Sequence, residues 1–555
     1  MVNHNLIDYT SRVAKYTFGN TLDEQLAQLK DNPLMQRFQI ARQETKGGRF
    51  RPIYHFINPE GGLNDPNGLC FWQGRWHLFH QAYPPEDPRQ HWGHAVSDDL
   101  IHWQDLPYAI YPNPEESCFS GATLVEEDRV IAIYHGTKVG NMVATSSDPL
   151  LLNWDKVAGQ AVIPIKSLDG SPLPYRVFDP CIWKKDGTYY ALSGGTVPTG
   201  PGGTPRCADF LFRSDDLEHW EYLHPFVEGD QFTANGDDGA CPYFWPIGDK
   251  HMLLFFSHRR GGQYLIGDYD TARDKFVATD HGHFNFGAAW PSGVHAPSAT
   301  PDGAGGIVTI FNMNWGLPIW QDDSEQGRKS DAVWGMQIMS LPRHLTLSDE
   351  GQLRIEPAGA IETLREQHTQ VREQTIPANE VKVFDGVEGN AFELLMEIDT
   401  NDAPAVYVDV LASPDRQEYT RITFYRNRGL KPMASRGHIL STPRGDGAYS
   451  LISIDTSHSS TLPDALSRAP ETAPVYLEPD ENLSLRIFVD KSIVEVFVNG
   501  KQCVATRVYP AREDSIQFAV GTQGNAIRVV SLDAWQLKSI YRKSAVKPPP
   551  SGVGI

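Results

Sequence analysis

The stretch Asn64-Asp65-Pro66-Asn67-Gly68 decides how this sequence is interpreted. Aromatic and apolar residues lead into it over 54–57 and leave it over 69–72. Asn, Asp, Pro and Gly all favour turns, each for its own backbone reason. Composition alone therefore predicts a tight turn between two strands, in which Asp65 acts as an Asx-type hydrogen bonder. The segments that follow decide whether Asp65 is more than a turn residue.

Three further segments follow in a fixed order: Phe79-His80-Gln81, then His91-Trp92-Gly93-His94-Ala95, then Phe119-Ser120-Gly121-Ala122. Together with the first stretch they resemble glycoside hydrolase family 32, the group of invertases, inulinases and levanases. The catalytic domain of that family has an N-D-P-N-G turn, a Gln-bearing strand, a W-G-H-A segment and an F-S-G segment in this order. The resemblance implies a five-bladed β-propeller with the active site in its central funnel, followed by a C-terminal β-sandwich.

Length, charge and cysteine content set bounds on the kind of protein. The 555 residues suffice for more than one domain. The formal net charge of −20 argues against nucleic acid or an anionic membrane as a partner, because either would attract a basic face. No apolar run reaches about 18 residues, so no membrane span is expected. The first 30 residues contain no apolar segment of a secretory signal, and the 6 cysteines are scattered. We expect free thiols and a cytoplasmic protein, or a secreted one if its native signal is missing here.

Residues 1–50 are predicted to form a helical extension. Thr21 and Glu24 have the spacing of a capping box. Apolar residues then recur on one helical face: Leu22, Leu26, Leu29, Leu34 and Phe38. We expect this stripe to pack against the catalytic domain. The alternative is a contact between two copies of the chain, so a homodimer through the extension is conceivable.

Residues 51–350 are predicted to be the catalytic domain. Short β-branched and aromatic runs alternate with Gly, Pro, Asn and Asp clusters, which is typical of an all-β fold. The segment Ser97–Trp103 recurs as Ser214–Trp220, with a looser copy from Ser147 to Trp154. Repeats at this spacing favour propeller blades. We expect the Asp residues of each copy to build a turn and the Trp to pack between blades.

The remaining chain is divided into a linker, a second β domain and a tail. Residues 351–374 are predicted to be the linker. Strands with cleaner alternation resume over 375–542, and Asn499-Gly500 predicts a hairpin of type I′ character. Such alternation predicts two packed antiparallel sheets, and Arg486–Phe497 resembles the C-terminal sandwich of the family. The tail, 543–555, is predicted to be disordered.

Two carboxyl groups are needed to cleave a fructosidic bond with retention: one attacks, and the other donates a proton and then activates water. The resemblance implies that Asp65 is the nucleophile. The family also has a carboxylate in an R-D-P motif that supports the transition state, and Asp179 matches it. Here Phe178 stands beside the Asp, and Arg176 lies three residues before it. Arg176 either reaches the site across a bulge or is a surface residue.

The family's acid/base motif, E-C-P, matches Ala240-Cys241-Pro242, and alanine cannot transfer a proton. Either the chemistry is lost, or the loop is remodelled and an Asp just before the motif supplies the acid. In an extended segment Asp238 would share a face with Ala240, because side chains alternate along a strand. We therefore expect Asp238 to be the acid/base, with Asp237 as second choice. A solvated turn over 237–239 is the structural alternative.

The resemblance also implies a pocket lining. Asn64, Gln81 and Ser120 would hydrogen-bond fructosyl hydroxyls, and Trp92 and Phe119 would form apolar walls. The sequence contains no metal-ligand or nucleotide-binding motif, so no cofactor is expected. The implied activity is that of a retaining glycoside hydrolase acting on terminal β-D-fructofuranosides such as sucrose or short fructo-oligosaccharides. The alternatives are a fructosyltransferase with the same covalent intermediate and a non-catalytic fructan-binding protein.

Overall fold

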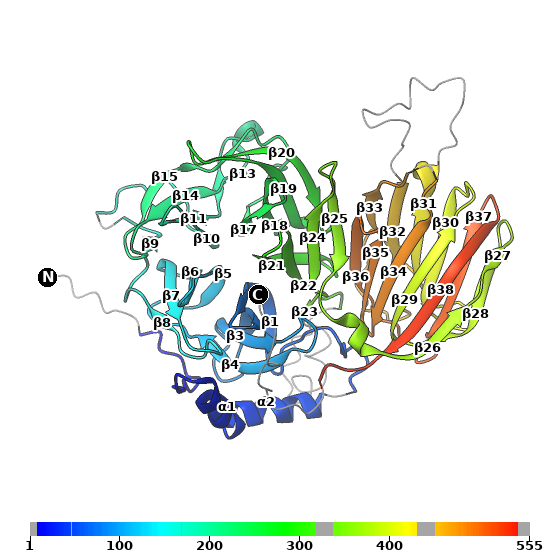
Figure 1. Ribbon diagram of the computed structural model, residues 1–555, viewed down its shortest axis with the longest axis horizontal. Coiled ribbons are helices and arrows are strands. Elements are labelled where there is room, and N and C mark those ends of the chain that lie inside the picture. The colour runs from blue at the N-terminus through cyan, green and yellow to red at the C-terminus, as the bar shows by residue number, and fades with distance from the viewer. Residues whose placement is uncertain are drawn as a thin grey trace.

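The computed structural model describes residues 8–45, 47–167, 169–317, 337–429, 450–478 and 480–541. A ring of five sheets lies beside a two-layered sandwich, and two helices lie against the ring (Figure 1). The predicted all-β architecture of propeller and sandwich with a short helical extension is confirmed. The predicted disordered tail falls outside the described residues. Within the described residues, no helix has the length and apolar character to cross a membrane.

The N-terminal helices pack against the ring through the expected apolar stripe. Helix α1 (Leu22–Lys30) begins at the capping box of Thr21 and Glu24, and α2 (Pro33–Glu44) begins with a proline behind the cap residue Asn32. Leu29 packs in a cluster with residues of the first two blades, and Leu34 and Phe38 pack against the first blade. The propeller itself therefore covers this stripe.

Each blade is built around a four-stranded antiparallel meander. Blade 1 contains β1 (Gly62–Trp72), β2 (Arg75–Tyr83), β3 (His91–Ser97) and β4 (Gln104–Ile110). Blade 2 contains β5 (Cys118–Val125), β6 (Val130–Gly136), β7 (Gly140–Ser146) and β8 (Asp155–Lys156), with β9 (Ile163–Pro164) on β7. Blade 3 contains β10 (Pro180–Lys185), β11 (Thr188–Ser193), β14 (Phe210–Ser214) and β15 (Glu221–Pro225), and a separate pair, β12 (Thr196–Val197) and β13 (Arg206–Cys207), follows β11.

The last two blades carry extra short strands. Blade 4 contains β17 (Ala240–Ile247), β18 (Lys250–Ser257), β19 (Gly261–Asp270) and β20 (Lys275–His283), with β16 (Val227–Glu228) on β20. Blade 5 contains β21 (Val294–Pro301), β22 (Ile307–Met313), β24 (Arg343–Leu347) and β25 (Leu353–Pro357), with β23 (Ile338–Met339) on β22. The first strands of the blades contact one another around the ring (Figure 1). Their starting ends therefore converge near the axis.

The sequence repeat marks the turn between the third and fourth strands of blades 1, 2 and 3. Asp99 and Asp216 each accept hydrogen bonds from two backbone N–H groups of their turn. Trp154 packs in a cluster shared by blades 1 and 2, and Trp220 packs against one shared by blades 2 and 3. The predicted roles in turns and in packing between blades are confirmed for these residues.

The predicted linker, 351–374, is wrong. Strand β25 is the outer strand of blade 5, and β26 (Arg365–Val371) already belongs to the sandwich. Only residues 358–360 and the short helix η2 (Ile361–Leu364) lie between them. Polar, irregular composition suggested a linker, but both strands lie at or near sheet edges, where one face meets solvent and apolar alternation is weak.

The sandwich consists of two antiparallel sheets, as predicted. One sheet contains β26, β27 (Gln374–Ile376), β29 (Ala391–Asp399), β34 (Leu483–Asp490), β35 (Ile493–Val498), β36 (Gln502–Arg507) and β38 (Ile527–Leu537). The other contains β28 (Val381–Glu388), β30 (Ala405–Ala412), β31 (Thr420–Tyr425), β32 (Ser450–Asp455), β33 (Glu471–Val475) and β37 (Gln517–Gln523). Asn499 and Gly500 both have positive φ, 51° and 62°, as a type I′ turn requires.

Propeller and sandwich share a buried charged contact. Arg343 of blade 5 pairs with Glu495 of β35 at 3.0 Å, and all of both side chains is buried. His55, just before β1, bridges Glu495 at 3.1 Å and Asp490 at 2.9 Å. These contacts fix the sandwich against the blades that carry the site.

Candidate active site

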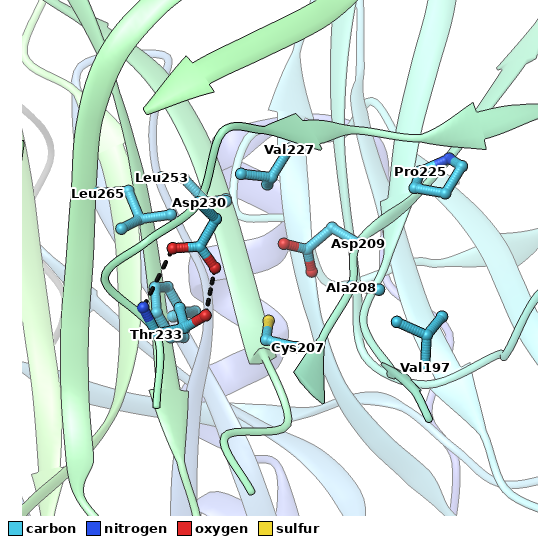
Figure 2. Close-up of a pocket in the computed structure, with 11 residues that line it drawn as sticks. Val197, Cys207, Ala208, Asp209, Pro225, Val227, Asp230, Thr233, Leu253 and Leu265 are labelled. Carbon is cyan, nitrogen blue, oxygen red and sulfur yellow. Dashed lines mark hydrogen bonds between the residues drawn. The ribbon is translucent and has the colours of Figure 1, made fainter. Parts of the chain in front are cut away.

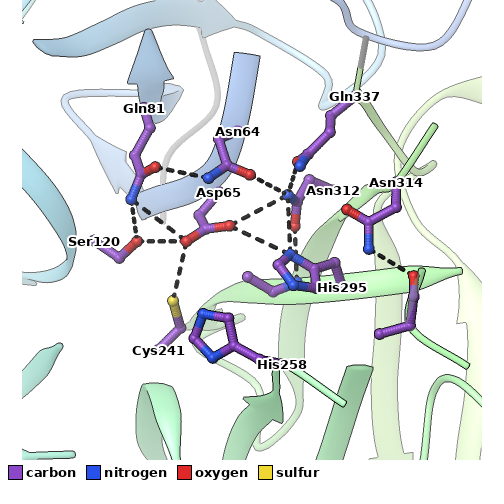
Figure 3. A network of polar contacts seen from close by, with 12 residues as sticks. Asn64, Asp65, Gln81, Ser120, Cys241, His258, His295, Asn312, Asn314 and Gln337 are labelled. Carbon is purple, nitrogen blue, oxygen red and sulfur yellow. Dashed lines mark hydrogen bonds and ion pairs between the residues drawn. The ribbon is translucent and has the colours of Figure 1, made fainter. Parts of the chain in front are cut away.

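Asp65 is the centre of a buried polar network in the funnel (Figure 3). Its Oδ2 accepts hydrogen bonds from Ser120 Oγ at 2.7 Å and Gln81 Nε2 at 3.4 Å. Its Oδ1 accepts one from Asn312 Nδ2 at 3.2 Å and lies 3.6 Å from His295 Nδ1. Asp65 is therefore held from blades 1, 2 and 5 at once.

The predicted lining residues Asn64, Gln81 and Ser120 all belong to this network. Gln81 Nε2 donates to Ser120 Oγ at 2.7 Å, and Gln81 Oε1 accepts from Asn64 Nδ2 at 2.9 Å. Asn312 Nδ2 donates to Asn64 Oδ1 at 3.2 Å and also to Gln337. These residues orient the carboxylate, and their contacts with fructosyl hydroxyls stay a prediction.

Four β-bulges explain why site residues come from the starts of inner strands. At one point in each of β1, β5, β17 and β21, the strand spans three residues where its neighbouring strand spans two, so it contains one extra residue. The extra residue falls at or next to Asp65, Ser120, Cys241 and His295, in that order. A bulge re-aims side chains beside it. The predicted tight turn at 64–68 is thus wrong, because these residues lie inside a bulged strand.

Asp179 is the second buried carboxylate of the funnel, and it immediately precedes β10. Its Oδ2 accepts a hydrogen bond from the backbone N–H of Cys241 at 3.1 Å, and its Oδ1 has no partner among the described residues. The Cys241 Sγ atom lies 3.5 Å from Asp179 Oδ2 and 3.6 Å from Asp65 Oδ2. One thiol therefore bridges the two carboxylates.

The two carboxylates differ in proton affinity. Burial, and next the negative charge of Asp65, raise the pKa of Asp179 to about 7. Burial also opposes ionisation of Asp65, but the neighbouring His295 and the Ser120 hydroxyl outweigh it and lower the pKa of Asp65. Near neutral pH the site thus contains an ionised Asp65 beside a group that can exchange a proton.

The two departures from the family motifs meet in one apolar cluster. Ala240, Cys241, Phe256 and Ala296 form the cluster, and Phe178 packs against it. Phe178 occupies the place of the family's Arg, and Ala240 that of its Glu. The two positions that hold an Arg and a Glu in the family motifs therefore meet in an apolar cluster in this chain.

The other predicted site residues lie as follows. Phe119 is half-buried beside His135. Trp92 is not a pocket wall, because its ring is fully buried between Phe79 and Tyr134 and its indole N–H donates to the Phe119 carbonyl at 2.8 Å. Arg176 is exposed beside Gly195, and within the described residues it has no hydrogen bond to the Asp65 network.

The two predicted proton donors, Asp237 and Asp238, differ in burial and in their partners. Asp237 is fully buried in an ion pair with Arg260 at 2.5 Å, and it also accepts hydrogen bonds from Gln263 and the Ala234 N–H. Asp238 is partly exposed and pairs with His258. The extended segment that we expected is interrupted, because Gly239 has φ +63°.

Sequence reasoning missed His295, Asn312 and Gln337. The first two lie on β21 and β22 of blade 5, and Gln337 immediately precedes β23. No motif marks them, and Val-His-Ala-Pro and Phe-Asn-Met read as ordinary strand segments. Only the closure of the ring brings blade 5 against blade 1.

A second cavity, of about 140 Å³, lies outside the funnel between blades 3 and 4 (Figure 2). Asp209, Asp230 and Cys207 point into it. Burial, and next the charge of Asp230, raise the pKa of Asp209 to about 7. Among the described residues, no group of three or more His, Cys, Asp or Glu side chains is arranged to hold a metal ion.

Comparison with known proteins agrees with this geometry. Residues 55–357 match the model of the glycosyl hydrolases family 32 N-terminal domain, and residues 360–536 match that of the family 32 C-terminal domain. Sucrose-6-phosphate hydrolase of Escherichia coli is 26% identical, with 87% of this chain and 94% of that protein covered. Fructan 6-exohydrolase of Beta vulgaris is 27% identical, with 88% and 87% covered.

Solved structures share the fold. Fructan 1-exohydrolase IIa from Cichorium intybus superposes with a TM-score of 0.72 at 22% identity, covering 88% of this chain and 98% of that one. Sucrose-6-phosphate hydrolase from Lactobacillus gasseri gives a TM-score of 0.68 at 22% identity, covering 92% and 98%. With both of its domains matched, this chain belongs to glycosyl hydrolase family 32.

Proposed function

We propose that this protein is a retaining β-fructofuranosidase that removes terminal β-D-fructofuranosyl units from sucrose or short fructans. The observation that carries the proposal is the placement of Asp65. It is buried, ionised and held by Ser120, Gln81 and Asn312 at the convergence of the inner strands. A nucleophile fixed in this way needs little reorganisation when it attacks.

The relatives support the substrate class. Proteins named sucrose-6-phosphate hydrolase, levanase and fructan 6-exohydrolase match over most of this chain. One structure of the Cichorium intybus enzyme contains 1-kestose. All of these names refer to enzymes that act on fructose-containing sugars.

In the first step the Asp65 carboxylate attacks C2 of the fructosyl unit, and the bond to the leaving oxygen breaks. The leaving oxygen takes up a proton and departs as an alcohol. In the second step water, deprotonated by a base, attacks C2 and frees Asp65, so the fructose keeps the configuration of the substrate. Asp179, whose Oδ1 has no partner in the described part of the chain, accepts a hydrogen bond from a fructosyl hydroxyl and stabilises positive charge that develops at C2.

The test is turnover of sucrose and of a short inulin oligomer by the wild type and by Asp65→Ala. We expect the wild type to release fructose, first as the β-anomer by NMR, and Asp65→Ala to lose at least about 10⁴-fold in kcat. Release of the α-anomer first would contradict a covalent intermediate. Binding of fructosides without turnover by the wild type would instead indicate a fructan-binding protein.

A further inference from the structure

Among the described residues, the place of the family's acid/base Glu contains no carboxylate. Ala240 is fully buried and has no proton to give. Asp237 is fully buried and neutralised by Arg260. Asp238, the other predicted donor, engages His258 through both carboxylate oxygens. Among the described residues, a retaining fructosidase on this scaffold therefore needs a proton donor of another kind that faces the funnel.

His258 is the residue whose contacts fit that requirement. It follows β18 directly, and 55% of its side chain is exposed. Asp238 Oδ1 accepts a hydrogen bond from the backbone N–H of His258 at 3.3 Å, and Asp238 Oδ2 lies 2.5 Å from His258 Nδ1. Since the carboxylate engages Nδ1, Nε2 is the ring nitrogen left for a ligand among the described contacts. A carboxylate that fixes an imidazole in this way sets its tautomer and stabilises its charged form.

His258 lies close to the nucleophile Asp65, and His295 contacts both of them. Its ring centroid lies 6.0 Å from that of His295, whose Nδ1 lies 3.6 Å from Asp65 Oδ1. The ring centroid of His258 also lies 6.4 Å from that of Phe178, and Phe178 packs on the apolar cluster around Ala240. Figure 3 shows His258 next to Cys241, on the side of Asp65 away from Gln81.

We propose that His258, oriented by Asp238, is the general acid and base of the fructosidase reaction, in place of the family's Glu. The inference rests on the proposed function. As Asp65 attacks C2, the C2–O bond breaks, its electron pair stays on the leaving oxygen, and the proton of His258 Nε2 passes to that oxygen. Neutral His258 then takes a proton from the water whose oxygen attacks C2, and the electron pair of the Asp65–C2 bond returns to the carboxylate. Imidazolium and carboxylate are thereby regenerated.

The charged groups around His258 favour this cycle. The hydrogen bond that Asp238 accepts from the His258 ring raises the pKa of His258 and outweighs burial, and the charges of Asp238, Asp65 and Asp179 add to the effect. These carboxylates come from the segment before β17, from β1 and from the residue before β10. Among the described residues, His295 on β21 also faces the ring.

Two other titratable groups that the structure describes in the funnel are less suited to the role. His295 has 12% of its side chain exposed and contacts Asp65 directly, so it orients the nucleophile. Asp179 accepts a hydrogen bond from the Cys241 N–H, and the Cys241 thiol lies between Asp179 and Asp65, so we assign Asp179 to the fructosyl unit.

The test compares His258→Gln with a matched control, His219→Gln. His219 forms the same kind of pair with Asp216, at 2.8 Å, on an exposed turn between β14 and β15. On sucrose we expect His258→Gln to lose about 10²–10⁴-fold in kcat/KM and the control to match the wild type. On p-nitrophenyl β-D-fructofuranoside, whose phenolate leaves without a proton, kcat/KM of His258→Gln should stay within a few-fold of the wild type. Azide attacks the covalent intermediate without a general base. It should therefore accelerate the slow turnover of this substrate by His258→Gln and form fructosyl azide.

Asp238→Asn tests the positioning role. Without that carboxylate the pKa of His258 falls, so the alkaline limb of kcat/KM on sucrose should move to lower pH, while Asp216→Asn should leave it in place. Equal losses by His258→Gln on both substrates, or sucrose activity close to that of the control, would overturn the assignment of His258. If the wild type and the His219 control release fructose from neither substrate, the fructosidase function itself is contradicted, and this proposal falls with it.

Discussion

The backbone N–H of Cys241 donates a hydrogen bond of 3.1 Å to Asp179 Oδ2. Cys241 is in the left-handed region, with φ +48°, which a non-glycine residue adopts at some cost. The bulge at the start of β17 imposes this conformation and turns the N–H toward blade 3. Blade 4 therefore positions a carboxylate of blade 3.

Asp179→Asn should lower kcat/KM on sucrose by roughly 10²–10³-fold, because a carboxylate that accepts a substrate hydrogen bond in the transition state is lost. Asp209→Asn is the matched control, since Asp209 is also buried with an unpartnered Oδ1 among the described residues, but in the cavity between blades. Steady-state kinetics on both variants is the measurement. Equal activity of the two variants would remove Asp179 from the reaction.

Asp209 should make stability depend on pH. Its pKa is about 7 in the folded protein and about 3.8 when exposed, so between these values the folded state holds more protons than the unfolded state. Stability contributed by this group is therefore lost as pH rises from about 4 to about 7. Asp209→Asn should be more stable than the wild type by a few kcal/mol at about pH 8 and by little at about pH 4.5. Thermal unfolding at both pH values measures the difference in stability between Asp209→Asn and the wild type. A difference that does not change with pH would contradict the prediction.

Ser120→Ala should move the acid limb of kcat/KM to higher pH by up to about one unit. The Ser120 hydroxyl helps to lower the pKa of Asp65, and Asp65 must be ionised to attack. Thr123→Ala on the same strand removes a hydrogen bond to the Gly68 carbonyl and no contact with Asp65. The measurement is the pH dependence of kcat/KM on sucrose for both variants. Equal shifts of the acid limb would show that the Ser120 hydroxyl does not specifically lower the pKa of Asp65.

Glu495→Gln should destabilise the protein by about 3–5 kcal/mol, because it leaves Arg343 buried without its partner charge. The comparison is Glu362→Gln, whose pair with Arg486 is half-exposed and should contribute under about 1 kcal/mol. Urea unfolding of both variants measures the difference. Similar effects would mean that the buried contact does not fix the sandwich to the propeller.

Ala240→Glu should destabilise the chain, because it adds a carboxylate to the apolar cluster against which Phe178 packs. The double variant Ala240→Glu/Phe178→Arg adds a positive charge to the same cluster, so its melting temperature should lie above that of Ala240→Glu alone. Additive effects in a double-mutant cycle would show that the two positions do not interact.

The sequence predicted those features that depend on local patterns and ordered motifs. Alternating runs and turn clusters predicted an all-β chain, and Thr21 with Glu24 predicted the first helix. The motif around Asp65 led to the family and to Asp179. The linker was mispredicted, because an edge strand such as β25 shares its polar composition with a connection.

The tertiary structure decided the position and partners of residues whose contacts join distant segments of the chain. Asp237 and Asp238 are neighbours in sequence, but the positive φ of Gly239 and the partners Arg260 and His258 send one into the core and the other to the funnel. Trp92 matched a pocket motif, but ring closure buries it. By itself the sequence determined the fold class, the family and the two carboxylates, since these follow from periodicity and motif. Only the closed propeller decided which groups surround them, because its inner strands bring five separate blades to one point.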